Sequence, residues 1–169
     1  MEYEKIIELA NNWNPSFVLR DSIDEVADMI NKPHEDYPLR VPYTKEMIET
    51  IIVQDLKFLI EHDVKGIHGF VMNDFKSRGR YRNINVRVGQ YIPPDFIFVS
   101  GLMENIFPVT IETDLVKWYS IFETIHPFED GNGRVGGIVV AALSFLKDGK
   151  FLSPKRNGDD KYFLPEILS

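Results

Sequence analysis

The nine-residue run from His126 to Arg134, His-Pro-Phe-Glu-Asp-Gly-Asn-Gly-Arg, brings a base, a carboxylate, an amide, a guanidinium and two glycines close together. Apolar residues at helical spacing flank the run on both sides, which predicts a loop between two helices. Pro127 disfavours helical geometry at His126, so the first helix should end there and fix the imidazole at its terminus. An imidazole in that place can act as a general base near neutral pH.

The second half of the run suits the binding of a phosphate anion. Gly131 and Gly133 permit unusual backbone angles, so that with Asn132 they can turn successive N–H groups inward at a helix start. Such N–H groups bind anions, and the Arg134 guanidinium adds a fork for phosphate oxygens. Asp130 is a hard oxygen ligand that suits Mg²⁺. These residue types predict transfer of a phosphoryl or nucleotidyl group from a bound polyphosphate to a hydroxyl. The alternative is a capped turn in which the histidine is a structural donor.

Helical spacing of apolar residues predicts the elements that must position this loop. From Ile111 to Ile125 the spacing predicts a well-buried helix that ends at His126. The spacing resumes at Val135 and ends near Gly149, which suits a helix C-cap. Further helices are predicted over residues 44–62, 62–75 and 95–107, with short helices and turns up to about residue 42, and a short helix or loop over residues 150–169.

The segment from Tyr81 to Ile92 has a weak strand pattern, in which apolar residues 84, 86 and 88 alternate with polar residues. Gly89 and Gln90 can turn the chain, which predicts a small hairpin. A lone hairpin in a helical protein either packs on the helices or leaves an edge open to a peptide strand.

Two other features of the sequence allow either a structural or a functional interpretation. His68 is expected to be a core or boundary histidine with a hydrogen-bond partner. A stretch of twelve residues without an acid forms either a solvated basic loop or a local field that attracts a polyphosphate or an acidic partner. Its basic residues are Lys76, Arg78, Arg80, Arg82 and Arg87.

The composition is that of an ordinary globular protein. The chain has 169 residues, of which 44% are hydrophobic and 27% charged, and this predicts a single domain. It has no cysteine, which excludes disulfides and thiolate sites. We see no signal peptide and no apolar run long enough to span a membrane, so we expect a cytoplasmic protein with no membrane partner. The net charge of -7 argues against general nucleic-acid binding.

The run from His126 to Arg134 resembles, without a gap, the signature of the Fic family, His-Pro-Phe-x-Asp/Glu-Gly-Asn-Gly-Arg-x-x-Arg. Residues 79–89 and the prolines at 93 and 94 resemble the family's flap. The resemblance implies a mainly α protein, a helical bundle with a small β-hairpin flap. It also implies a single Fic domain over residues 1–169, with N-terminal helices over 1–43, a core over about 44–150 and a short tail over 151–169.

The resemblance further implies Mg²⁺-dependent transfer of AMP from ATP to a Ser, Thr or Tyr hydroxyl of a target protein. His126 would be the base that deprotonates the hydroxyl, and Asp130 would hold Mg²⁺ on the α- and β-phosphates. The residues implied to bind phosphate are Gly131, Asn132 and Gly133, around the α-phosphate, and Arg134, at the β-phosphate. The flap residues implied to dock the target's main chain as an added strand are Asn85, Val86, Arg87 and Val88.

The chain departs from the signature at Gly137, where the family has a second arginine that grips the outer phosphates. The absence of this second arginine predicts one of three outcomes. Catalysis is weaker, the transferred group is a different nucleotide, phosphate or phosphocholine, or the protein is a scaffold with little turnover. The alternative is that Gly137 simply allows close helix packing. Residues 100–105 fit the letters of the family's inhibitory helix, but Glu104 would find no arginine at position 137. We therefore expect a separate antitoxin-like inhibitor, or a weaker or different restraint.

Overall fold

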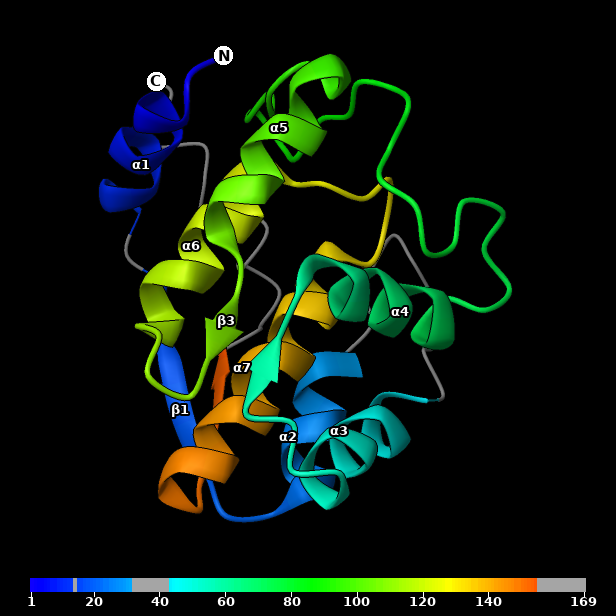
Figure 1. Cartoon of the computed structure of the whole chain (residues 1–169), viewed down its shortest axis with the longest axis vertical. Coiled ribbons are helices and arrows are strands. Elements are labelled where there is room, and N and C mark those ends of the chain that lie inside the picture. The colour runs from blue at the N-terminus through cyan, green and yellow to red at the C-terminus, as the bar shows by residue number, and fades with distance from the viewer. Residues whose placement is uncertain (14, 32–42, 155–169) are drawn as a thin grey trace.

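A computed structural model describes residues 1–13, 15–31 and 43–154. Helices make up most of these residues and the strands are short, which confirms the mainly α prediction (Figure 1). The α-helices are α1 Tyr3–Asn11, α2 Ile23–Asn31, α3 Thr44–Val53, α4 Glu61–Val71, α5 Val99–Met103, α6 Leu115–Ile125 and α7 Asn132–Asp148, with the 3₁₀ turns η1 Phe96–Phe98 and η2 Glu104–Ile106. The strands are β1 Phe17–Arg20, β2 Phe58–Leu59, β3 Val109–Thr110 and β4 Phe151–Pro154. None of the described helices is long and apolar enough to cross a bilayer.

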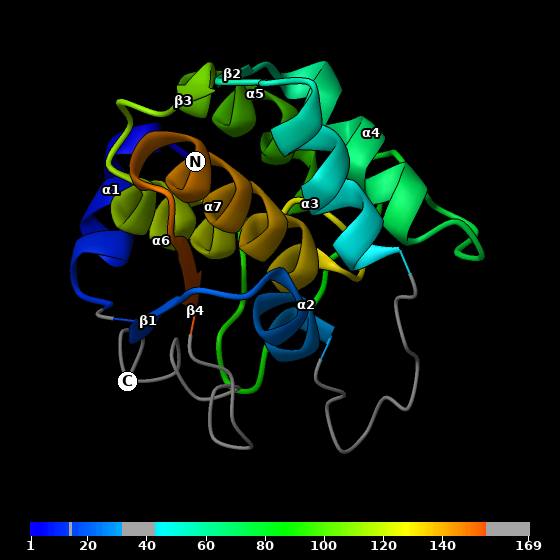
Figure 2. The same cartoon turned by 90° about the horizontal axis from the view of Figure 1, so that it is seen from below.

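The helix after the reactive loop, α7, lies at the centre of the fold, between α6, α3 and α2 (Figure 2). Two glycines let its neighbours approach closely. A Cβ built on Gly136 would lie 3.0 Å from the ring of Tyr119 on α6, and one built on Gly137 would lie 3.0 Å from Ile30 on α2. Close packing is therefore the structural role of Gly137.

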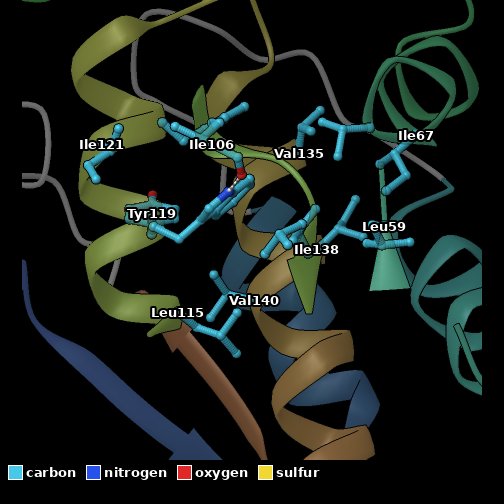
Figure 3. Packing of buried hydrophobic residues seen from close by; sticks show 14 of the residues in the cluster. Leu59, Ile67, Ile106, Leu115, Tyr119, Ile121, Val135, Ile138 and Val140 are labelled. Carbon is cyan, nitrogen blue, oxygen red and sulfur yellow. Dashed lines mark hydrogen bonds between the residues drawn. The ribbon is translucent and has the colours of Figure 1, made fainter. Parts of the chain in front are cut away.

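Figure 3 shows one apolar cluster in which side chains of α6 and α7 meet those of α4 and β2. Val135 and Ile138 of α7 are fully buried in it, as is Leu59 of β2. Burying a side chain of this size contributes about 1.5–3 kcal/mol relative to leaving it exposed. The core thus forms around the helix whose first turn carries the reactive loop.

Two short antiparallel strand pairs close the ends of the helical core. β1 pairs with β4, with Phe17 opposite Pro154 and Arg20 opposite Phe151. The predictions of only helices and turns before residue 42, and of a helix or loop after residue 150, were wrong at these strands. Each strand forms only with a partner far away in the sequence, so the local pattern does not reveal it. Residues 32–42, the last part of the predicted N-terminal helices and turns, and the tail from residue 155 lie outside the described residues.

The single helix predicted over residues 44–62 is also wrong, because α3 ends at Val53. Asp55 takes a left-handed conformation with φ of 54°, and Leu59 then pairs with Val109 in the second small sheet. The apolar residues that continued the helical spacing come from a turn and a strand. Likewise α6 starts at Leu115 rather than near residue 111, since the carboxylate of Asp114 accepts the Lys117 N–H at 3.1 Å.

The flap forms a hairpin turn, but its two arms are joined by a single β-bridge and not by a longer run of backbone hydrogen bonds. Val88 and Tyr91 exchange two backbone hydrogen bonds of 2.9 Å around Gly89 and Gln90, and Gly89 has φ of +61°. The predicted turn is therefore confirmed, but the strand predicted over residues 81–89 is reduced to this one bridge. Among the described residues, no backbone hydrogen bond pairs the main chain of residues 83–87 with another strand.

Candidate active site

His126 ends α6 in a left-handed conformation, with φ of 54° and ψ of 64°. Its Nδ1 lies 3.3 Å from the carbonyl oxygen of Glu123. Because a carbonyl only accepts, this contact assigns the hydrogen to Nδ1 and leaves Nε2 as the basic nitrogen. No described residue forms a hydrogen bond with Nε2, and the side chain is half-buried.

Burial lowers the pKa of the His126 imidazole to about 4, the Glu123 carbonyl opposes this effect, and the positive charge of Arg82 lowers the pKa further. The imidazole is therefore neutral at physiological pH, which is the state that a general base requires.

The guanidinium of Arg82 is the principal contact of the His126 turn, and sequence reasoning placed it in the basic stretch without distinguishing it from its neighbours. Arg82 is 3% exposed, and its Nε donates to the carbonyl of His126 at 2.7 Å. The other basic residues of that stretch are exposed: Lys76, Arg78, Arg80 and Arg87. The sequence neighbours of Arg82, Tyr81 and Asn83, offered no sign of this burial, because the acceptors of its guanidinium are main-chain carbonyls.

The loop after His126 is closed by the side chain of Asn132. Its Oδ1 accepts the Phe128 N–H at 2.8 Å, and its Nδ2 donates to the Phe128 carbonyl at 2.8 Å. Phe128 itself is fully buried and anchors the loop in the core. Asn132 was predicted to help bind phosphate. Its side-chain amide is engaged with the backbone of Phe128, so the group that it would offer to a phosphate is its backbone N–H.

The first turn of α7 has the backbone geometry of an anion site. Gly131 has φ of 86°, and an added Cβ would lie 3.0 Å from the Met72 side chain, so this position requires glycine. The first intrahelical bond runs from Val135 N to Gly131 O. Among the described residues, nothing accepts the N–H groups of Asn132 and Gly133, which lie at the positive end of the helix dipole.

Arg134 lies just inside this turn and is 8% exposed. Its Nη1 lies 3.7 Å from the sulfur of Met72. The side chain predicted to hold a β-phosphate is thus packed against the same methionine that supports Gly131. Gly131 and the Arg134 guanidinium thus share one support, Met72, at the end of α4.

Glu129 and Asp130 place two carboxylates in the same loop, shortly before α7 begins. Asp130 Oδ1 accepts the Gly131 N–H at 2.8 Å, and Glu129 Oε2 accepts the Ser77 hydroxyl at 3.1 Å. In the described part of the chain, no group of three or more histidine, aspartate or glutamate side chains is arranged so that it could hold a metal ion by itself. A Mg²⁺ ion fits such a site through one carboxylate together with phosphate oxygens and water, which is its usual environment in proteins. The carboxylate of Asp130 meets that requirement.

His68 is a buried structural histidine, as predicted. Its Nδ1 accepts the Gly79 N–H at 2.8 Å, so Nε2 must donate to the Asp130 carbonyl at 2.9 Å. The ring stacks on Phe128 with centroids 4.0 Å apart. Burial lowers the pKa of His68, and the neutral ring connects Gly79, at the start of the flap, to Asp130 of the loop.

The flap is fixed to the body through Asn85, whose side chain was among those predicted to dock a target. Its Oδ1 accepts the Phe96 N–H at 2.9 Å, and its Nδ2 lies 3.3 Å from Asp95. Val86 and Val88 are half-buried and Arg87 is exposed. The structure thus brings the flap to the His126 turn through Arg82, while Asn85 can offer only its main chain to a partner.

Comparison with known proteins gives two matches. The model of the Fic/DOC family matches residues 58–144, which include the flap, α6, the loop and most of α7. A protein of Aquifex aeolicus (strain VF5) named as a probable protein adenylyltransferase is 29% identical over 80 residues, which cover 41% of this chain. The match covers 25% of that relative, so the chain spans about a quarter of its length. Because the family model covers more than half of the chain, this protein belongs to the Fic/DOC family.

Proposed function

We propose that the protein transfers AMP from ATP to a Ser, Thr or Tyr hydroxyl of a target protein. The observation that carries the proposal is a neutral His126, with Nε2 open, joined by a short loop to the unfilled N–H groups of α7. Membership of the Fic/DOC family and the printed name of the Aquifex relative support it.

In this mechanism the target's hydroxyl oxygen forms a bond to the α-phosphorus of ATP, and the bond from that phosphorus to the bridging oxygen of pyrophosphate breaks. His126 Nε2 accepts the hydroxyl proton. The N–H groups of Asn132 and Gly133 stabilise charge on the α-phosphate, and Arg134 offers its guanidinium to the β-phosphate. Mg²⁺, held at Asp130, would neutralise phosphate charge when bound.

The low pKa of His126 fits this cycle once the nucleotide is considered. A pKa of about 4 keeps the imidazole neutral but makes it a weak base in the empty site. Polyphosphate bound at the neighbouring helix N-terminus adds negative charge, which favours the protonated imidazole and raises its pKa. The donor would thereby strengthen the base at the moment when the base is needed.

The target would bind along the flap. The main chain of residues 83–87 has no strand partner among the described residues, so an extended segment of the target can pair with it. Val86, Arg87 and Val88 would border that segment, while the Asn85 side chain is occupied by the Phe96 N–H.

Position 137 favours a second candidate, in which the transferred group is another nucleotide, phosphate or phosphocholine, or turnover is weak. Ile30 covers Gly137, so α7 provides no cation for outer phosphates at this position. Glu104 is exposed on η2 and finds no arginine there, so we propose that a separate antitoxin-like protein restrains the enzyme, or that its restraint is weaker or different.

The test is incorporation of label from α-labelled ATP and Mg²⁺ into the protein itself or into proteins of a lysate. His126→Ala should abolish incorporation while the protein stays folded. Intact-mass measurement with a panel of nucleotides and nucleotide-linked donors identifies the group transferred. A folded wild-type protein that transfers nothing from any donor would contradict the proposal.

A further inference from the structure

Most of the hydrogen bonds that cap the C-terminal end of α6, which presents His126, come from Arg82 and Tyr91 of the flap. Successive carbonyls at the end of the helix each accept a hydrogen bond. The pairs are Glu123 O with His126 Nδ1, Thr124 O with the Tyr91 hydroxyl, Ile125 O with Arg82 Nη2, His126 O with Arg82 Nε, and Pro127 O with the Arg82 backbone N–H. A helix end normally leaves its last carbonyls to solvent or a glycine cap, so this one is unusually well held.

The same guanidinium also gathers the two ends of the flap. Arg82 Nη1 donates to the Ile84 carbonyl at 3.0 Å, and Nη2 donates to the Pro94 carbonyl. Ile84 lies before the turn at Gly89 and Gln90, and Pro94 lies after it. One buried cation therefore connects both arms of the flap to the backbone of His126.

Arg82 forms no ion pair among the described residues, and its partners are main-chain carbonyls. A charge that is 3% exposed needs compensation, which the negative end of the α6 dipole can supply. Arginine suits this place because its planar fork reaches several acceptors at once, whereas the point charge of a lysine cannot.

We propose that Arg82, assisted by Tyr91, is a positioning residue that fixes the His126 backbone and couples the flap to the base. A left-handed conformation at a residue other than glycine is strained and persists only where its surroundings hold it. Arg82 holds the His126 carbonyl from one side, while the backbone N–H of Arg82 holds Pro127. An extended peptide on the flap is thereby set at a fixed position relative to Nε2.

The role of His126 as a base rests on the proposed function, but the physical coupling between Arg82 and His126 does not. It can therefore be measured without any turnover. The variants are Arg82→Met, which removes charge and fork, Arg82→Lys, which keeps only the charge, and Tyr91→Phe, which removes one hydroxyl. The matched control is Arg80→Met, because Arg80 is exposed and, among the described residues, its guanidinium donates only to the Lys76 carbonyl.

The readouts are the NMR titration of the His126 imidazole and hydrogen exchange of the flap amides. Arg82→Met should raise the pKa of His126, since it removes a positive charge beside the ring. Arg82→Lys should leave that pKa near its wild-type value but speed exchange of the flap amides. Tyr91→Phe should speed exchange at the end of α6, and Arg80→Met should change neither readout.

A kinetic arm tests the consequence for transfer. Misplacing the base by about 1 Å costs on the order of 10²-fold in rate, so Arg82→Lys should lower kcat by that order while ATP affinity stays unchanged. A wild-type protein without transfer activity would refute the proposed function, and the NMR arms would still decide this inference. The inference is overturned if folded Arg82 variants show wild-type His126 titration and wild-type flap exchange. If Arg82→Met does not fold, Arg82→Lys and Tyr91→Phe carry the test through hydrogen exchange.

Discussion

Ile30 of α2 lies directly over Gly137 of α7, so that a Cβ built on the glycine would come within 3.0 Å of Ile30 Cγ1. This contact explains in physical terms why the chain lacks an arginine at this position of the family signature. The site for a guanidinium is taken by an apolar side chain of another helix, and that helix belongs to the core. The departure from the signature is therefore coupled to the packing of α2.

Replacement of Gly137 by arginine should destabilise the protein. Overpacking a closely packed site costs about 1–3 kcal/mol, which exceeds the roughly 1 kcal/mol that leaving glycine gains in a helix. Adding Ile30→Ala should recover part of the loss, because the cavity receives the new side chain. Urea unfolding of the two single variants and the double variant measures this coupling.

Gly101→Arg on α5 is the matched control, because nothing lies within 4 Å of a Cβ built there. It should leave stability unchanged or slightly raised. Strict additivity of Gly137→Arg and Ile30→Ala would show that the two positions do not compete for space. ATP titration of the double variant then reveals whether an arginine here increases affinity for the triphosphate.

Lowering the pH should decrease the free energy of unfolding, because it protonates His68. Burial lowers its pKa in the folded state, and its Nδ1 must stay unprotonated to accept the Gly79 N–H. The stability that this histidine contributes is fully present above its ordinary pKa of 6.5. It is lost progressively as the pH falls below that value toward the folded-state pKa. Urea unfolding between neutral and mildly acidic pH measures the slope.

His68→Phe should flatten this slope and lower stability at neutral pH, since it leaves the Gly79 N–H and the Asp130 carbonyl without their partner. Each buried unsatisfied group costs about 1–3 kcal/mol. His62→Gln, on the exposed face of the same helix, controls for the loss of a histidine. His126 contributes a slope of the same sign, so only the difference between wild type and His68→Phe reports on His68. An unchanged slope in His68→Phe would refute this assignment.

Much of the site could be predicted because its signal is local. The loop from His126 to Arg134, the end of α6, the start of α7 and the Gly149 cap follow from residues close together in the chain. The helical spacing was misleading where non-local contacts decide the structure. Leu59 continued a helical pattern but pairs with Val109, and β1 forms only with β4.

The supporting contacts of the site could not be predicted for the same reason. Arg82 lies in the same acid-free basic stretch as the exposed Arg80, and its burial depends on the approach of the carbonyls at the end of α6. Asn132 was recognised, but its bond to the backbone of Phe128 depends on the turn that Gly131 permits. The residue types were enough to propose a chemistry for the loop. The supporting roles of Arg82 and Asn132 could be assigned only from the three-dimensional structure.

Asn132→Asp should loosen the loop before α7 even though it keeps a similar shape. An aspartate accepts the Phe128 N–H but cannot donate to the Phe128 carbonyl, and it places two carbonyl-type oxygens in contact. The expected loss of stability is about 1–3 kcal/mol. Unfolding experiments measure it, and Asn105→Asp is the control, because Asn105 is exposed and also donates to backbone carbonyls. Equal effects of the two substitutions would contradict a special role for Asn132.

Nucleotide binding should be accompanied by proton uptake at His126. The empty site holds its pKa at about 4, through burial and the charge of Arg82. Polyphosphate at the N-terminus of α7 stabilises the imidazolium, so the pKa rises and protons are taken up at pH values between the two pKa values. Calorimetric titration with a non-hydrolysable ATP analogue in buffers of different ionisation enthalpy counts these protons. His126→Ala should abolish the uptake without abolishing binding. The measurement is made just above the pKa of His126 in the empty site, which is about 4. Binding without proton uptake by the wild type at that pH would mean that the phosphates do not lie beside His126.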